Sequence, residues 1–216
     1  MAARERILRR IRRAQGHGGP APSAAEREVV DRYLRAHPRG PLPAIEDDRV
    51  ARFCDRARMA SCSWARVARL DDAPAAVRRY LDAQALPTSG CVWPALAGLD
   101  WAGAGLALAA RAAQGDDAVG VTGAFCGLAE TGTLMLVSGA ESPASVSLLP
   151  ETHVAVLPVG RIVAHMEDGW ALARRELHTL PRAVNFISGP SRTADIEQTL
   201  VLGAHGPYRV HIVLIG

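Results

Sequence analysis

The sequence predicts an α/β protein with a mostly parallel sheet flanked by helices and with a helical N-terminal region. From residue 118 onward, short β-branched runs alternate with helix-like segments, a pattern typical of parallel sheets covered on both faces. The first 60 residues instead place apolar side chains at helical spacing. The chain has 216 residues, 49% of them hydrophobic, which is enough to bury one sizeable core.

The N-terminal region is expected to contain three helices. The first places Ile7, Leu8 and Ile11 on one face, with arginines on the others. The second begins at the capping box Ser23-Ala-Ala-Glu26 and turns Val30, Tyr33 and Leu34 inward. The expected helices cover residues 4–14, 23 to about 37, and 47–60.

The remaining elements follow from apolar runs and helical periodicity. Strands are expected at residues 63–69, 91–93, 118–122, 132–138, 153–159, 184–187 and 210–215. Helices are expected after Asp72 and at residues 144–149, 167–178 and 193–202.

Charge and composition divide the chain into an arm and a body. A Gly/Pro-rich hinge at 16–22 predicts a basic arm, 1–22, and a domain, 23–216, whose helical part is 23–60 and whose sheet-containing part is 61–216. Residues 1–80 hold 18 arginines against 10 acids, and residues 81–216 hold 7 against 12, giving about +8 and −5. The arm is either a solvated helix or a surface for nucleic acid, an acidic membrane or an acidic partner protein. Aromatic residues make only 5% of the chain and do not interleave with the arginines, so nucleic acid is not the expected partner.

Composition also excludes several chemistries. All 25 cationic residues are arginine, so amine chemistry of the Schiff-base, pyridoxal-phosphate or Walker type is not available. The histidines show no metal-ligand spacing, so no metal is expected. Neither a membrane-spanning run nor a secretory signal is indicated, and a cytoplasmic location is expected. The four cysteines match no cluster or redox spacing and are expected to be buried thiols: Cys54, Cys62, Cys91 and Cys126.

The first candidate site surrounds Glu130, which stands between apolar runs and precedes Thr131, Gly132 and Thr133. A carboxylate beside a flexible glycine at a strand end is poorly solvated unless it has a partner. Glu130 is therefore a candidate base, nucleophile or substrate ligand. In the alternative interpretation, the Glu130 carboxylate accepts hydrogen bonds from backbone N–H groups in a β-turn and only fixes the conformation of the loop.

The second candidate site is the segment 186–197, which leads from a strand through a Gly-Pro turn into the predicted helix 193–202. A helix N-terminus with hydroxyls and a guanidinium suits a phosphate or a carboxylate. Acids near the start of a helix also complement its dipole without any ligand, so that alternative stays open. The residues concerned are Ser188, Gly189, Ser191, Arg192, Thr193, Asp195 and Glu197.

The third candidate is the tight loop 203–207, in which His205 lies between Gly203 and Gly206. A histidine there can titrate near neutral pH and reach a cleft at the strand ends, or it can be an ordinary turn residue.

Three segments closely resemble the lactate utilization protein C family, whose members contain a LUD domain. They are AETGTLML at 129–136, LLPETHVAVLPVGRIV at 148–163 and SGPSRTADIEQTLVLGAHGP at 188–207. The resemblance covers residues 115–216 well and is looser before them. It implies the fold of the sugar-phosphate isomerase and CoA-transferase superfamily. It also implies work with two partner proteins, at least one of them iron–sulfur, in oxidising L-lactate to pyruvate, with no cofactor in this chain.

The resemblance assigns the three candidate segments to one ligand site. We expect an anion cleft between them, in which Arg192 holds a small carboxylate or phosphate. Glu130, Asp195 and His205 are the candidates for proton transfer. Two alternatives remain: a stand-alone enzyme on a CoA ester or sugar phosphate with Glu130 as nucleophile, and a non-catalytic assembly subunit. The absence of lysine argues against a lysine-assisted isomerase.

Overall fold

The computed structural model describes residues 3–16, 22–45, 48–194, 200–203 and 205–216. The chain forms two compact units, Met1–Leu42 and Pro43–Gly216. The division expected after residue 22 stays a prediction. Within the described ranges, no helix has both the length and the apolar character needed to cross a bilayer.

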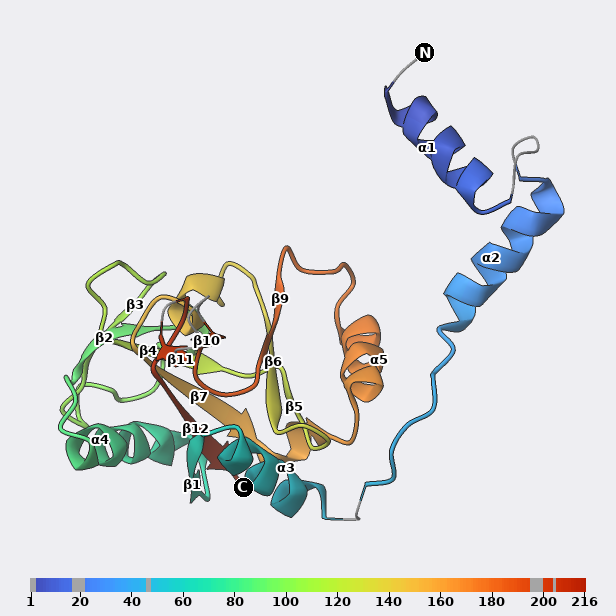
Figure 1. Ribbon diagram of the computed structural model, residues 1–216. Helices are drawn as coiled ribbons and strands as arrows, with labels where there is room; N and C mark the ends of the chain where they lie inside the picture. The colour runs from blue at the N-terminus through green and yellow to red at the C-terminus, as the bar shows by residue number, and fades with distance from the viewer. Residues whose placement is uncertain (1–2, 17–21, 46–47, 195–199, 204) are drawn as a thin grey trace. The chain divides into compact units, whose positions relative to one another are not determined.

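The first unit consists of two helices, α1 (Ala3–Ala14) and α2 (Ala24–Ala36) (Figure 1). The predicted capping box is present at the start of α2: the Glu26 N–H donates to Ser23 Oγ at 3.2 Å, and the Ser23 N–H donates to Glu26 Oε2 at 2.7 Å. The inward orientation expected on α2 is wrong, because neither helix has a buried residue in so small a unit. The side chains concerned, Val30, Tyr33 and Leu34, are all exposed.

The second unit is built on a six-stranded sheet in which every neighbouring pair is parallel. The predicted mostly parallel α/β fold is therefore confirmed. In spatial order the strands are β1 (Ser63–Val67), β12 (Arg209–Ile215), β7 (Thr152–Pro158), β4 (Val119–Gly123), β2 (Ser89–Val92) and β3 (Ala107–Ala110).

Alternating side chains of this sheet enter two different cores. On β7, Val154 and Val156 face the core that contains Val77 and Leu81 of α4 (Ala73–Ala83). Their neighbours Ala155 and Leu157 face the opposite core, which contains Phe53 of α3 (Arg49–Met59). Both faces of the sheet are therefore covered, and this explains the nearly continuous apolar runs of the central strands.

A second, four-stranded sheet packs on the α3 side of the first. Its order is β8 (Ile162–Val163), β5 (Cys126–Leu128), β6 (Thr133–Val137) and β9 (Val184–Ile187). Helix α5 (Met166–Glu176) covers its other face through Leu172 and Ala173 (Figure 1). The sequence predicts β6 and β9 as strands but does not separate them from the parallel sheet.

The helix predicted at residues 193–202 is wrong. The structure instead contains an antiparallel pair, β10 (Arg192–Ala194) and β11 (Leu200–Leu202), in which Thr193 faces Val201. Both of these residues are β-branched and favour a strand. The predicted helix at 144–149 shortens to a 3-10 turn, Ala144–Ser147, and other 3-10 turns are Leu70–Asp72, Pro94–Leu96 and Val159–Arg161.

Candidate functional site

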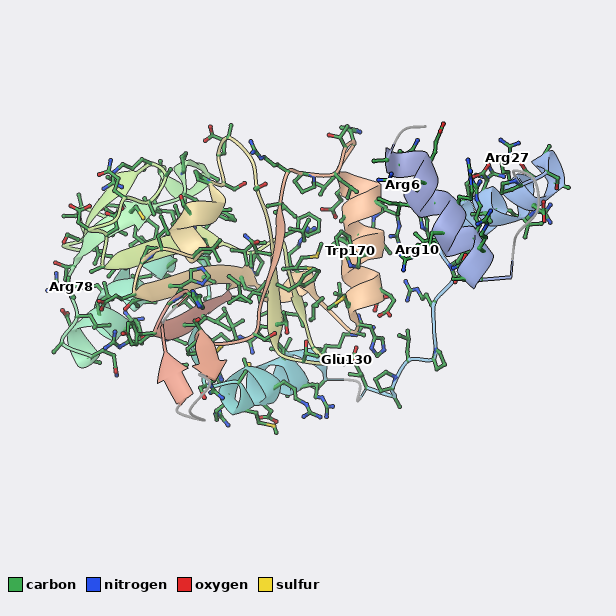
Figure 2. The ribbon with its side chains drawn as sticks, turned by 45° about the horizontal axis from the view of Figure 1, so that its top comes forward. Arg6, Arg10, Arg27, Arg78, Glu130 and Trp170 are labelled. Carbon is green, nitrogen blue, oxygen red and sulfur yellow. The ribbon has the colours of Figure 1, made fainter. Side chains whose placement is uncertain are left out.

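Glu130 lies in the tight turn that joins β5 to β6 (Figure 2). The turn closes with the N–H of Gly132 donating to the carbonyl of Leu128 at 2.9 Å. Gly132 has φ +68°, and a Cβ at this position would lie 2.2 Å from the backbone nitrogen of Ala57 on α3. Glycine is therefore required twice here, by the left-handed backbone and by the approach to the helix.

His165, at the N-terminus of α5, is the partner of Glu130. Its Nδ1 lies 3.0 Å from Glu130 Oε2, and the imidazole is 12% exposed while the carboxylate is 31% exposed. Strands β5 and β8 are parallel, with Leu128 opposite Val163, so both side chains lie two residues beyond a paired position. Sequence reasoning missed His165, because only this strand pairing connects two positions 35 residues apart.

Three hydroxyls continue from Glu130 along the end of the second sheet. Thr131 Oγ1 lies 2.7 Å from Thr133 Oγ1, which lies 2.5 Å from Ser188 Oγ. Thr133 is 3% exposed, so its hydroxyl depends on these two neighbours for hydrogen bonds. Strand β9 brings Ser188 here, because Ile187 pairs with Leu134 in the antiparallel ladder.

The segment after β9 runs along the C-terminal end of α3. Gly189 has φ +89°, and a Cβ there would meet the carbonyl oxygen of Ala60 at 2.0 Å. The Arg192 guanidinium donates to Ser61 Oγ. The prediction that Arg192 holds an anion at a helix N-terminus is wrong in its geometry, since Arg192 begins strand β10. Whether its guanidinium binds an anion stays a prediction.

The loop 203–207 lies against Ser191. The Ser191 N–H donates to the carbonyl of Pro207, and the Gly203 N–H donates to the carbonyl of Ser191, both at 2.9 Å. A Cβ on Gly206 would touch Ser191 Cβ at 3.3 Å. His205 is exposed. The second and third candidate segments are therefore neighbours, as expected, while the catalytic role given to His205 stays a prediction.

Part of the expected site cannot be placed. Asp195 and Glu197 lie outside the described residues, and Thr193 is described only through its backbone in β10.

The Glu130–His165 pair has the geometry of a carboxylate-oriented base. With Nδ1–H donated to the carboxylate, the lone pair of a neutral imidazole is on Nε2 and can accept a proton from a bound molecule. The carboxylate then stabilises the imidazolium that forms. Carboxylate–imidazole pairs serve as general bases in this way.

The cysteines are buried thiols, as predicted. Burial raises the pKa of Cys62 and Cys126 to about 11 and that of Cys91 to about 12, so little thiolate exists at neutral pH. Among the described residues, no group of three or more His, Cys, Asp or Glu side chains could hold a metal ion.

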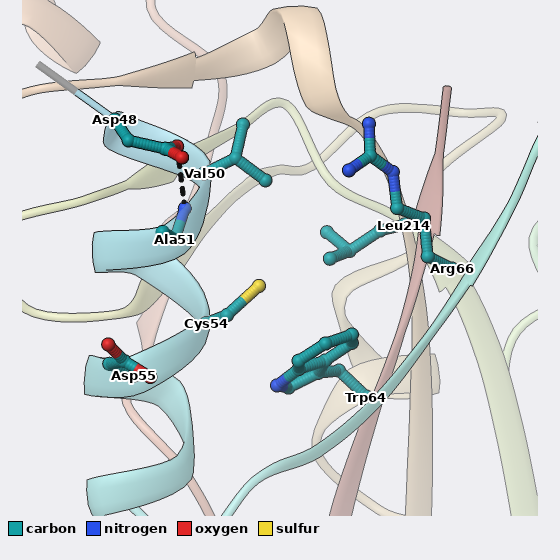
Figure 3. A pocket seen from close by; sticks show the side chains of 8 residues that line it. All are labelled: Asp48, Val50, Ala51, Cys54, Asp55, Trp64, Arg66 and Leu214. Atoms are coloured by element: carbon teal, nitrogen blue, oxygen red, sulfur yellow. Dashed lines mark hydrogen bonds between the residues drawn. The ribbon is translucent and has the colours of Figure 1, made fainter.

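A pocket of about 500 Å³ separates α3 from strands β1 and β12 (Figure 3). The Cys54 thiol and the Trp64 ring point toward each other across it, and Arg66 lies at one end. Asp48 lies at the start of α3, where its carboxylate accepts the N–H of Ala51 at 2.9 Å. Burial raises the pKa of Cys54, so this pocket offers no ready nucleophile.

The sequence matches a known domain family and several curated proteins. The LUD domain matches residues 97–215. Lactate utilization protein C of Halalkalibacterium halodurans is 43% identical over 115 residues, which are 50% of this chain and 47% of that protein. The protein of the same name from Bacillus subtilis is 41% identical over 100 residues, covering 45% of this chain and 42% of its own length. The matched part therefore spans less than half of either relative.

A longer match and a solved structure agree with these. Lactate utilization protein C of Anoxybacillus flavithermus is 31% identical over 193 residues, which are 89% of this chain and 71% of that protein. The crystal structure of a DUF162 family protein from Deinococcus radiodurans has a TM-score of 0.58 at 19% identity, over 81% of this chain and 100% of that one, and it shares the fold. On the domain match and the long alignment together, this chain belongs to the LUD-domain family.

Proposed function

We propose that this chain acts in lactate utilization, as a subunit that works with two partner proteins, at least one of them iron–sulfur, in oxidising L-lactate to pyruvate. Its family and the shared name of its curated relatives support the role in lactate utilization. The Glu130–His165 pair is the single observation that supports a chemical contribution from this chain.

Oxidation of a 2-hydroxy acid to a 2-oxo acid releases two electrons and two protons. In the proposal, Nε2 of His165 accepts the proton of the substrate hydroxyl while Glu130 holds Nδ1–H. The C2–H bond breaks in the same oxidation, and its two electrons and its proton pass to the redox groups of the partners. This chain carries no cofactor of its own. The exposed hydroxyls of Thr131 and Ser188, which the buried Thr133 hydroxyl joins, can hydrogen-bond the substrate or its water.

Reconstitution tests the proposal. The purified chain and its two partner proteins are assayed separately and together for lactate-dependent pyruvate formation. We expect activity from the three together and none from this chain alone. The proposal fails if the partners are fully active without it.

Two variants test the contribution of the pair. Glu130→Gln and His165→Asn should each lower the turnover of the reconstituted system by roughly 10²–10⁴-fold, the range for losing a general base. Glu176→Gln is the matched control. Glu176 ends α5, the helix that begins after His165, and pairs with Arg161 at 2.9 Å instead of with the histidine. Equal turnover in Glu130→Gln, His165→Asn and wild type would remove the pair from the chemistry.

The variant Glu130→Gln also distinguishes the subunit proposal from the alternative of a stand-alone enzyme. A CoA ester that reacts with a nucleophilic Glu130 would leave an acyl-anhydride on its carboxylate, visible as a mass increase in wild type and absent in Glu130→Gln. The hydrogen bond to His165 favours the base role instead, since one carboxylate oxygen is already engaged.

Helix α1 supports a second candidate function, assembly through an acidic partner. Its sequence carries six arginines around Ile7, Leu8 and Ile11, all three of which are exposed, and Arg6 and Arg10 project from it (Figure 2). A basic helix with an exposed apolar face suits an acidic protein surface. Deleting residues 1–15 should weaken complex formation with the partners, and unchanged binding would remove the arm from assembly.

A further inference from the structure

A second pocket, of about 360 Å³, opens where strands β1 and β12 begin, beside α4. No residue lines both this pocket and the pocket beside Cys54. Its polar lining consists of side chains that can recognise a small polar ligand: Ser61, Ser63, Tyr80, Gln84, Tyr208 and Arg209. The volume is in the range of small-molecule sites.

Parallel pairing and one stacked ring build the inner wall of this pocket. Ser63 is the direct cross-strand partner of His211, and its Oγ lies 2.8 Å from His211 Nδ1. The Tyr80 ring, from α4, stacks on the imidazole with a centroid distance of 3.9 Å and an angle of 8° between the planes. The Ser63 hydroxyl and the Tyr80 phenol are therefore held in fixed positions.

His211 is unusual within this wall. It is 4% exposed, and its Nε2 has no hydrogen-bond partner among the described residues. Burial lowers the pKa of His211 to about 4, so the ring is neutral at physiological pH. A neutral, stacked imidazole orients Ser63 without adding a charge, and the pocket's only lining cation is Arg209 within the described part of the chain.

Arg209 supplies that charge. The side chain is partly buried, and no ion pair joins it to an acid among the described residues. Tyr80 and Arg209 line the same pocket. Burial raises the pKa of Tyr80, and the positive charge of Arg209 opposes this rise. A partly buried arginine that lines a pocket together with hydroxyl side chains, and that pairs with no acid in the described ranges, suits an anionic ligand.

We propose that this pocket binds a small carboxylate, a hydroxy or oxo monoacid, with Arg209 pairing with the carboxylate and the hydroxyls of Ser63 and Tyr80 hydrogen-bonding its remaining oxygen. One guanidinium balances a monoanion, whereas a phosphate dianion would leave a charge without a partner. The pocket volume also accommodates a three-carbon acid entirely but not a whole CoA ester.

The pocket and the Glu130–His165 pair are separate groups of residues. The inference rests on the proposed function only for the choice of lactate and pyruvate as probes. Pro190 also lines the pocket, so the segment after β9 that carries Ser188 forms part of the wall.

Titration of the purified 216-residue chain tests the proposal. Dissociation constants for L-lactate, D-lactate, pyruvate and inorganic phosphate are measured by chemical-shift titration of the ¹⁵N-labelled protein. We expect carboxylates to bind more tightly than phosphate. Arg209→Gln should weaken carboxylate binding about 10–100-fold, as expected for the loss of a charged hydrogen-bond partner. Tyr80→Phe should weaken it by about 2–10-fold.

Matched variants make each outcome decisive. Arg182→Gln, in a different pocket, should leave the dissociation constants unchanged. Glu130→Gln should leave the dissociation constants of this pocket unchanged while it lowers the turnover of the reconstituted system by roughly 10²–10⁴-fold, so that failure of the base and failure of this pocket are distinguishable. If Arg209→Gln fails to fold, Arg209→Lys and Tyr80→Phe provide the test, and each should weaken binding. Equal binding in these variants and wild type, tighter binding of phosphate, or no binding of any acid would overturn the proposal.

Discussion

Replacing Gly132 with alanine should destabilise the second unit, because this glycine fixes the distance between the Glu130 turn and α3. The residue has φ +68°, and its missing side chain makes room for the α3 backbone. An added Cβ would lie 2.2 Å from Ala57 N and 2.5 Å from Arg56 C. Both atoms belong to a helix backbone, which cannot rotate away as a side chain can.

Two costs add at this position. A non-glycine residue in the left-handed region costs about 1–2 kcal/mol. Overpacking against a fixed neighbour costs about 1–3 kcal/mol more. The free energy of unfolding should therefore fall by about 2–5 kcal/mol. For a unit of this size the melting temperature should fall by roughly 4–20 °C.

Urea unfolding followed by tryptophan fluorescence measures the change. Gly98→Ala is the control, because a Cβ there meets nothing within 4 Å, and its free energy of unfolding should stay within about 0.5 kcal/mol of wild type. If Gly132→Ala also stayed within that range, the close approach of the turn to α3 would be refuted.

Three further predictions use the same unfolding assay. Burial lowers the pKa of His153 to about 3 and of His211 to about 4, against about 6.5 when unfolded. Each should therefore contribute stability above pH 6.5 that is lost at about 1.4 kcal/mol per pH unit as pH falls toward its folded pKa. His153→Gln should flatten this dependence, whereas exposed His178→Gln should not. Glu130→Gln should change the free energy of unfolding by less than about 1 kcal/mol, because the pair is partly solvated, and a larger loss would make the pair structural. Deleting residues 1–15 should not move the urea midpoint of the second unit, since α1 has no buried residue, and a clear shift would contradict the division into units.

Among the strands that the sequence predicts, β7 and β12 give the strongest signal. Strand β7 has six consecutive buried residues and β12 has five. In the sequence, each appears as a long, mostly apolar run between polar segments. The second sheet was not separable, because β5 has three residues and β8 has two, too few to show a period. The segment 193–202 was misassigned for a related reason: a short mixture of apolar and polar residues fits either period.

The site divides in the same way. A lone carboxylate in an apolar context predicts that Glu130 needs a partner, and this inference uses only local sequence. The identity of the partner depends on which strands pair, which no local pattern contains. The sequence predicts that the glycines contact a ligand. In the structure, Gly132 packs against the backbone of α3 and Gly189 packs against Ala60 at the C-terminal end of that helix. Close packing therefore explains why glycine is needed at both positions.

Strand pairing accounts for both polar pairs that carry the functional proposals. In a parallel ladder, residues in register project from the same level and to the same side. Ser63 and His211 are such partners within the first sheet, and Glu130 and His165 lie two residues beyond the Leu128–Val163 partners in the second. His211 therefore receives its hydrogen-bond partner from the neighbouring strand β1, and His165 receives its partner from the turn that follows the neighbouring strand β5. A change that shifts one register should disable the pair of that sheet and leave the other intact, so the base and the carboxylate pocket can be lost independently.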